Sequence, residues 1–241
     1  MPKVPDLADP RYLDEVGWFL YHEKYGRDQF GGSYDEERLA YSRMFLEEVL
    51  RFCGEEQDWL EDRTVVTIGC GCTGDLSFWP AERKVAVDPL LCVYQQLGML
   101  IRDRPDTSPT LHLSVGIESL PLLDAFADLV LCRNSLDHML NPEEGLKQIA
   151  RILKPDGTFF LSVDIGGKPT PDEPTVFSEQ SLIELLTRHF EMESPIDRSP
   201  PHSSGRTCRI RAVMAKRRSA QAALDKNAIL EAYVARFKKA Q

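Results

Sequence analysis

The sequence lacks the marks of a membrane-spanning or exported protein. No apolar run approaches the roughly 20 residues that cross a bilayer, and the first ten residues lack the apolar stretch of a signal peptide. With 42% hydrophobic and 28% charged residues, the 241-residue chain has an ordinary globular composition and can bury one substantial core. We therefore expect a cytoplasmic protein with no membrane partner.

Cysteine and histidine are too sparse to predict a disulfide framework or a metal centre. The six cysteines are spread along the chain, and only Cys70 and Cys72 lie close together. A zinc site would need two further soft ligands at a suitable spacing, and the sequence does not supply them. We expect reduced thiols and no bound metal, with Cys70 and Cys72 packing a turn.

Positive charge is also scarce. The 29 lysine and arginine residues are outnumbered by 38 acidic residues, so the formal net charge is −9. This is the wrong sign for a protein whose main partner is a phosphate backbone, and we expect no nucleic acid partner. The segment 216–241 is an exception, with seven basic and two acidic residues, and is predicted to be a basic amphipathic helix or tail.

Helical patterns occupy the first part of the chain. Asp9 can cap a first helix, and Ser33 with Glu36 three residues later forms a capping box for a second one. Apolar residues then follow a one-face helical spacing up to Gly54, where the second helix is expected to end.

From residue 64 the pattern changes to short apolar runs that alternate with helical patterns, which predicts a parallel sheet. The predicted strands cover residues 64–68, 84–87, 110–114, 128–132 and 158–163, followed by a terminal hairpin of 190–193 and 207–214. Helices are predicted at 142–153, capped by Asn141, and at 178–188. The chain is thus expected to divide into a helical segment (1–60), an α/β domain (61–215) and a tail (216–241).

A glycine-rich turn follows the first predicted strand. Gly69, Gly71 and Gly74 have the spacing G-x-G-x-x-G, which lets the backbone approach a ligand closely and bend toward a helix. The second strand ends at Asp88, about 20 residues further on, where an acid can accept hydrogen bonds from ribose hydroxyls. Turns of this kind bind nucleoside cofactors in more than one class of enzyme.

Later segments make the pattern more specific. With the turn and Asp88, the ordered succession of residues 117–121, 128–134 and 148–159 resembles the class I S-adenosylmethionine-dependent methyltransferases of the small-molecule type. The likeness covers roughly residues 64 to 215. It implies a Rossmann-like seven-stranded sheet in the order 3-2-1-4-5-7-6, helices on both faces and an N-terminal helical lid. It also implies S-adenosylmethionine as cofactor and S-adenosylhomocysteine as product.

The resemblance assigns the cofactor contacts by motif position. It places the methionine part against Gly69, Cys70 and Gly71, the ribose at Asp88, the adenine beside Ile117 and Glu118, and the sulfonium near Arg133 and Asn134. Two positions depart from the family, because Thr67 and Gly116 stand where an acid is usual. A protein that binds the nucleoside without turnover therefore stays open as an alternative.

Asp137 and His138 are the candidate catalytic residues. They follow the fourth predicted strand, whose carboxyl end is expected to open onto the ligand crevice. Methyl transfer to oxygen or nitrogen often uses a base that takes a proton, and histidine titrates near neutral pH. Aromatic residues of the first helices and the loop 166–175 are expected to wall the acceptor pocket.

The leading interpretation is a methyltransferase that acts on an O or N atom of a small-molecule metabolite. Two alternatives stay open: a catalytically inactive protein of the same fold that binds the cofactor or its product, and an NAD-dependent oxidoreductase, which the terminal hairpin disfavours. The acidic balance disfavours a nucleic acid substrate. The apolar face at 230–237 packs either on its own domain or on a second copy, so a homodimer is also left open.

Overall fold

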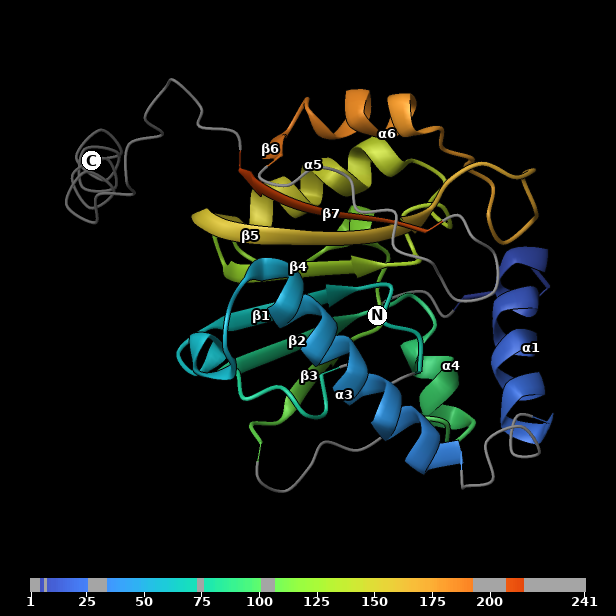
Figure 1. The fold of residues 1–241 in the computed structure, drawn as a ribbon. Coiled ribbons are helices and arrows are strands. Elements are labelled where there is room, and N and C mark those ends of the chain that lie inside the picture. The colour runs from blue at the N-terminus through green and yellow to red at the C-terminus, as the bar shows by residue number, and fades with distance from the viewer. Residues whose placement is uncertain are drawn as a thin grey trace, which may run out of the picture.

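The computed structural model describes residues 5–6, 8–25, 34–72, 76–100, 107–192 and 207–214. Its centre is a seven-stranded sheet in the order β3-β2-β1-β4-β5-β7-β6 (Figure 1). The strands are β1 (Thr64–Ile68), β2 (Arg83–Val87), β3 (Thr110–Leu113), β4 (Ala127–Arg133), β5 (Leu153–Asp164), β6 (Phe190–Met192) and β7 (Thr207–Met214). The α/β Rossmann-like class predicted from the sequence is confirmed, and this order is the one that the resemblance implies.

The first five strands run parallel to one another, and β7 runs in the opposite direction. β1 pairs in parallel with both β2 and β4, β2 pairs with β3, and β4 pairs with β5. β7 lies antiparallel between β5 and β6, which confirms the antiparallel pair predicted for the end of the domain. All five residues of β1 are buried, as expected for a central parallel strand that is covered on both faces.

β5 is longer than the sequence predicts. The sequence leaves residues 154–157 between the predicted helix at 142–153 and the predicted strand at 158–163, but β5 begins at Leu153. The reason is a register shift: Ala127 pairs with Leu153, whereas Leu129 pairs with Thr158. Residues 154–157 therefore form an irregularity inside the strand pair and do not separate a helix from a strand.

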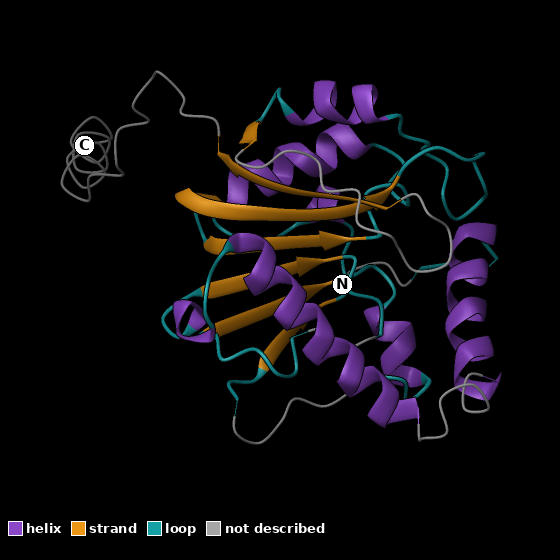
Figure 2. Ribbon diagram, viewed as in Figure 1, coloured by secondary structure: helices purple, strands orange, loops and turns teal. Residues whose placement is uncertain are grey.

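Helices cover both faces of the sheet, as Figures 1 and 2 show. The helices are α1 (Pro10–Tyr25), α3 (Tyr34–Cys53), α4 (Leu91–Gln96), α5 (Pro142–Ile152) and α6 (Glu179–Leu186), with short 3-10 turns η1 (Gln57–Leu60) and η2 (Ile117–Ser119). α5 and α6 pack on one face through a core that includes Val66, Val130 and Ile149. α3 packs on the other face around Phe45 and Phe160.

α1 belongs to neither of these two layers. It stands beside the end of the sheet toward which the arrows of β1 and β4 point (Figure 2). Its buried residues Val16 and Phe19 form a separate apolar cluster with Leu90, Val93 and Tyr94 at and within α4. This places α1 at the carboxyl ends of the parallel strands, where open α/β sheets bind their ligands.

Helix ends follow the signals in the sequence. Asn141 Oδ1 accepts a hydrogen bond from Glu144 N at 3.2 Å, and Pro142 occupies the first helical position of α5. Asp9 Oδ1 accepts from Arg11 N at 3.1 Å at the start of α1. Gly54 follows α3 with φ +69°, the left-handed conformation that ends many helices.

Some predictions fall outside the described residues. Ser33, Gly74 and the tail 216–241 lie outside the described ranges. The predicted capping box of Ser33 with Glu36 therefore stays a prediction. The division of the chain at residues 60 and 215 stays a prediction. Among the helices of the described ranges, none is long and apolar enough to cross a membrane.

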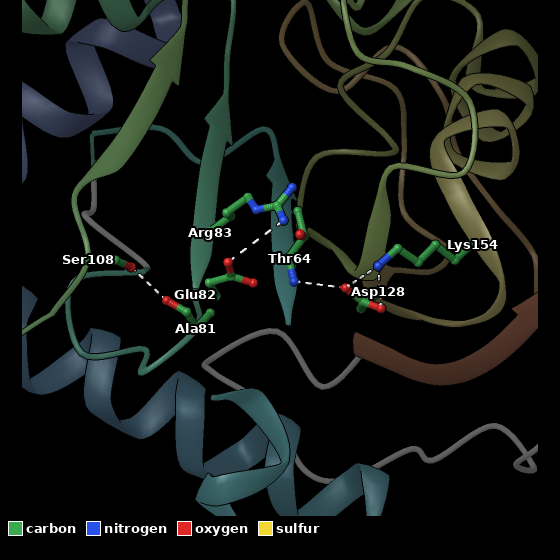
Figure 3. Close-up of polar contacts among 7 residues, drawn as sticks. All are labelled: Thr64, Ala81, Glu82, Arg83, Ser108, Asp128 and Lys154. Atoms are coloured by element: carbon green, nitrogen blue, oxygen red, sulfur yellow. Dashed lines mark hydrogen bonds and ion pairs between the residues drawn. The ribbon is translucent and has the colours of Figure 1, made fainter. Parts of the chain in front are cut away.

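A polar cluster ties together the amino-terminal ends of three parallel strands (Figure 3). The Asp128 carboxylate of β4 accepts from the backbone N–H of Thr64 at 2.9 Å and from Lys154 Nζ at 2.8 Å. Asp128 therefore links β4 to the start of β1 and to β5. Asp128 lies at the opposite end of these strands from the glycine turn, so its contacts stabilise the sheet at a distance from that turn.

Candidate functional site

The glycine turn begins directly after β1 and is held by both neighbouring strands. Gly69 N donates to Val87 O at 2.8 Å, and Ser135 Oγ, just past β4, donates to Ile68 O at 3.0 Å. Gly69 has φ +66°, and a Cβ placed on it would lie 2.2 Å from the Ser135 Cβ. Gly69 is therefore required by the close approach of the chain after β4, whatever ligand the turn binds.

Asp88, at the end of β2, holds the second glycine of the turn. Its Oδ2 accepts from Gly71 N at 2.9 Å, and its Oδ1 accepts from Leu90 N at 2.8 Å. The side chain is buried, and burial raises the pKa of the Asp88 carboxyl although both backbone hydrogen bonds oppose that shift. Each oxygen uses one lone pair in these bonds and keeps another for a ligand hydroxyl.

α1 covers the turn with an aromatic side chain. A Cβ placed on Gly71 would lie 2.7 Å from Cζ of Phe19, so the ring edge is against the glycine backbone. Phe19 also meets Tyr94 edge to face, with ring centroids 5.5 Å apart. Cys70 and Cys72 are buried in the same turn. The helical segment therefore packs directly on the candidate cofactor cradle.

Tyr94 contributes a buried hydroxyl to this region. The residue is fully buried, and its hydroxyl has no hydrogen-bond partner among the described residues. Burial is the main cause that raises the pKa of Tyr94, and the charges of Asp88 and Glu15 add to it. No sequence pattern marks this hydroxyl, because Tyr94 lies among apolar residues of α4.

The predicted adenine contacts lie in the turn η2. Ile117 is buried in the core, whereas Glu118 is exposed. The Glu118 carboxylate folds back over Gly116, because a Cβ at that glycine would lie 2.6 Å from Glu118 Oε2. A carboxylate thus occupies the space beside Gly116, the position where the sequence departs from the family pattern.

The residues predicted to face the sulfonium lie at the end of β4. The Arg133 guanidinium stacks over the rings of Tyr41 at 4.1 Å and Phe45 at 4.6 Å, both in α3. The Arg133 side chain therefore lies on the α3 face, where it borders a groove of about 410 Å³. Asn134 is exposed, has φ +44°, and donates its N–H to Ser162 O at 2.7 Å.

The predicted catalytic pair, Asp137 and His138, lies in a cluster of ionisable groups. Asp137 is 3% exposed, and its Oδ1 has no hydrogen-bond partner among the described residues. His138 Nε2 lies 3.9 Å from Glu173 Oε1, and His138 Nδ1 lies 3.8 Å from Glu15 Oε2 of α1. Glu15 and Glu173 are not predictable from the sequence, because they are 158 residues apart and carry no motif.

Burial governs the electrostatics of this cluster. It raises the pKa of Glu15 to about 7 and that of Asp137 to about 6, although the nearby His138 opposes both shifts. The loop that carries Glu173 is fixed to the segment of Asp137 and His138, since Thr175 N donates to Asp137 O at 3.2 Å. The predicted acceptor wall at 166–175 therefore does lie against Asp137 and His138.

Part of the sequence matches a known family of proteins. Residues 66–161 match the family model described as a methyltransferase domain. A tRNA U34 carboxymethyltransferase of Shewanella amazonensis is 36% identical over 111 residues, which cover 42% of this chain and 32% of that protein. An uncharacterized 37.1 kDa protein in transposon TN4556 of Streptomyces fradiae is 26% identical over 133 residues. The chain spans about a third of the length of the curated relatives it matches.

Solved structures share the fold at low sequence identity. A 1,6-didemethyltoxoflavin-N1-methyltransferase of Burkholderia thailandensis, solved with its acceptor and S-adenosylhomocysteine, has a TM-score of 0.56 and 20% identity. The match covers 88% of this chain and 93% of that one. The PH0226 protein of Pyrococcus horikoshii has a TM-score of 0.54 and 15% identity, covering 81% and 99% of the two chains.

Proposed function

We propose, from the class I methyltransferase domain that this chain carries, that it binds S-adenosylmethionine and transfers the methyl group to an O or N atom of a small molecule. The product of the cofactor is S-adenosylhomocysteine. The observation that carries the proposal is the bond between Gly71 N and Asp88 Oδ2 at 2.9 Å. It joins the glycine turn of the matched domain to the one buried acid that ends β2, the two parts that a nucleoside cofactor needs.

The proposed cofactor lies along the carboxyl ends of β1, β2 and β4. Its methionine part lies against the backbone of Gly69, Cys70 and Gly71, the turn that the family resemblance assigns to it. The ribose hydroxyls donate to the lone pairs that Asp88 keeps after its backbone hydrogen bonds.

The proposed adenine site uses Ile117 and Glu118. Ile117 contributes an apolar surface, and the Glu118 carboxylate accepts a hydrogen bond from the adenine amino group. This role for Glu118 is supported by its position over Gly116, because the carboxylate there takes the place of the missing family acid. The departure at residue 116 is thus compensated two residues later in the chain.

The sulfonium is proposed to lie beside the backbone of Arg133 and Asn134. The Arg133 guanidinium is stacked on the aromatic rings of α3, and a cation would repel the positively charged sulfonium, so the side chain is not the contact. The left-handed backbone of Asn134 is instead the feature that turns the chain at this point.

The acceptor is proposed to bind between α1 and the loop 166–175, with Asp137 and His138 on its reactive side. α1 would then act as the lid that the resemblance implies. Both side chains carry a buried atom without a hydrogen-bond partner among the described residues, Asp137 Oδ1 and His138 Nε2. Such atoms are suited to act on the proton of an acceptor hydroxyl or amine.

Calorimetric titration with S-adenosylhomocysteine tests the cofactor site. Asp88→Asn is expected to weaken binding about 10- to 100-fold, because one charged hydrogen-bond acceptor for the ribose is lost. Asp128→Asn is the matched control: it removes the same charge from a partly buried acid that also accepts a backbone N–H, but at the other end of the sheet. Equal losses in both variants would mean that Asp88 acts only through folding.

RNA is the second candidate acceptor, because the Shewanella relative is a tRNA-modifying enzyme. The net charge of −9 favours a small molecule instead. Incubation with cofactor labelled in the methyl group, followed by separation of small metabolites from tRNA, decides between the two. Label in neither fraction, with cofactor bound, would support a binding protein without turnover.

A further inference from the structure

Four ionisable side chains meet where the acceptor is proposed to bind. One nitrogen or oxygen from each of Asp137, His138 and Glu173 lies within 4.8 Å of the other two. Glu15 adds a second carboxylate on the far side of the imidazole, 3.8 Å from its Nδ1. A single proton-accepting histidine does not require three carboxylates around it, so this arrangement needs a further explanation.

Asp137 is the member that points to a bound cation. Its side chain is 97% buried, and the Oδ1 atom has no hydrogen-bond partner among the described residues. A buried carboxylate is strongly unfavourable unless it is paired or coordinates a metal ion. His138 Nε2 is also buried without a hydrogen-bond partner among the described residues, and it lies on the side of Glu173.

The three donors are arranged as in an open metal site. An imidazole nitrogen and two carboxylate oxygens bind a dication at about 2.0–2.2 Å, so their mutual separation of up to 4.8 Å closes by a modest shift of side chains. Catalytic metal sites often have three protein ligands and leave further positions for water or substrate. Glu173 is exposed enough on its loop to make that adjustment.

Glu15 has the position of an outer-shell partner. A histidine that binds metal through one nitrogen usually directs its other N–H to a carboxylate, which fixes the tautomer and the ring orientation. Glu15 Oε2 lies near Nδ1, whereas Nε2 faces Glu173. The helix α1 would therefore not only cover the acceptor site but also orient a ligand within it.

We propose that Asp137, His138 and Glu173 bind one divalent metal ion of the Mn²⁺ type, with Glu15 orienting His138. A mixture of one imidazole and two carboxylates suits Mn²⁺ better than Mg²⁺, which is bound mainly through oxygen. This site contrasts with the expectation of no metal from the sequence, because its ligands come from the segment after β4 and from a distant loop, which carry no shared motif.

The role of this ion, though not its binding, rests on the proposed function. A bound acceptor hydroxyl would lose its proton to water more readily, because a dication lowers the pKa of a coordinated hydroxyl. The acceptor oxygen then forms a bond to the methyl carbon, and the carbon–sulfur bond breaks with its electron pair passing to sulfur. With the ion bound, His138 and Asp137 would act on the acceptor proton through the ion that they hold.

Titration of the chelator-treated full chain with MnCl₂, followed by electron paramagnetic resonance of free Mn²⁺, tests the site. We expect one equivalent to bind saturably. Asp137→Asn and Glu173→Gln should each weaken binding at least tenfold, and Glu15→Gln about tenfold. Asp156→Asn, which removes the same charge from an exposed residue of β5, should leave Mn²⁺ affinity unchanged.

S-adenosylhomocysteine binding, measured on the same samples, separates the two proposals and shows that each variant is folded. Mn²⁺ binding without nucleoside binding would retain the metal site and overturn the proposed function. Nucleoside binding without saturable Mn²⁺ binding would overturn the metal site alone. Mn²⁺ binding that survives both Asp137→Asn and Glu173→Gln would also overturn it, because the ion would then lie elsewhere.

Discussion

The ring of Phe19 lies against the backbone of Gly71, so closely that a Cβ on the glycine would come within 2.7 Å of the ring Cζ. One of these residues lies in α1 and the other in the turn after β1. The contact joins the first helix to the turn proposed to hold the cofactor. Changes in either residue should therefore affect both the packing of α1 and the binding of the nucleoside.

Gly71→Ala should abolish measurable binding of S-adenosylhomocysteine and destabilise the fold. The residue has φ +56°, which costs a side chain about 1–2 kcal/mol, and the new methyl also displaces Phe19. Urea unfolding and calorimetry measure the two effects. Gly98→Ala is the control, since Gly98 has φ +70° but open space around it, and it should show the backbone effect alone.

Phe19→Ala should speed the dissociation of S-adenosylhomocysteine about tenfold, because the ring that covers the turn is removed. It should also lower the free energy of unfolding by about 3 kcal/mol, the usual loss for a buried phenylalanine. Stopped-flow displacement measures the rate. Trp18→Ala removes an exposed neighbour, and an equal effect of that change would show that Phe19 has no special role.

Gly69→Ala should unfold the turn unless Ser135 is shortened at the same time. The added Cβ would lie 2.2 Å from the Ser135 Cβ, and neither atom can rotate away. The double variant Gly69→Ala with Ser135→Gly removes that clash and should regain part of the lost free energy of unfolding, with the strain of φ +66° remaining. Additive losses in a double-mutant cycle would contradict the contact.

Tyr94→Phe should stabilise the ligand-free protein by about 1 kcal/mol. The hydroxyl is buried and has no hydrogen-bond partner among the described residues, so its removal relieves an uncompensated loss of hydration. Tyr21→Phe, in a side chain that is 61% exposed, should leave the free energy of unfolding unchanged. Destabilisation by Tyr94→Phe in urea unfolding would mean that the hydroxyl has a partner after all.

Patterns local in sequence predicted the fold well. β-branched apolar runs gave strands within one or two residues of β1 to β4, and β7 begins and ends where it was expected. Asn141 and Gly54 marked helix ends because capping depends on residues three or four positions apart. β5 departed from the prediction because its first residue pairs with Ala127 of another strand, a contact that local sequence does not contain.

The site was predicted only in part, for the same physical reason. Asp88 was predictable because the acid that ends the second strand follows the glycine turn at a characteristic spacing of about 20 residues. Glu15 and Glu173 were not, since only tertiary packing brings α1 and the loop after β5 to His138. Arg133 was predicted at the strand end, but its stacking on Tyr41 depends on how α3 crosses the sheet.

Thermal unfolding of the full chain with S-adenosylmethionine, S-adenosylhomocysteine, NAD or no ligand tests the central claim most directly. A ligand at a hundred times its dissociation constant adds roughly 2.7 kcal/mol, which is a rise of about 5 to 10 °C for a chain of this size. The account predicts that rise with both sulfur nucleosides and none with NAD. A rise with NAD alone would contradict it. So would the absence of a rise with every ligand, in a sample that mass spectrometry shows to be free of copurified nucleoside.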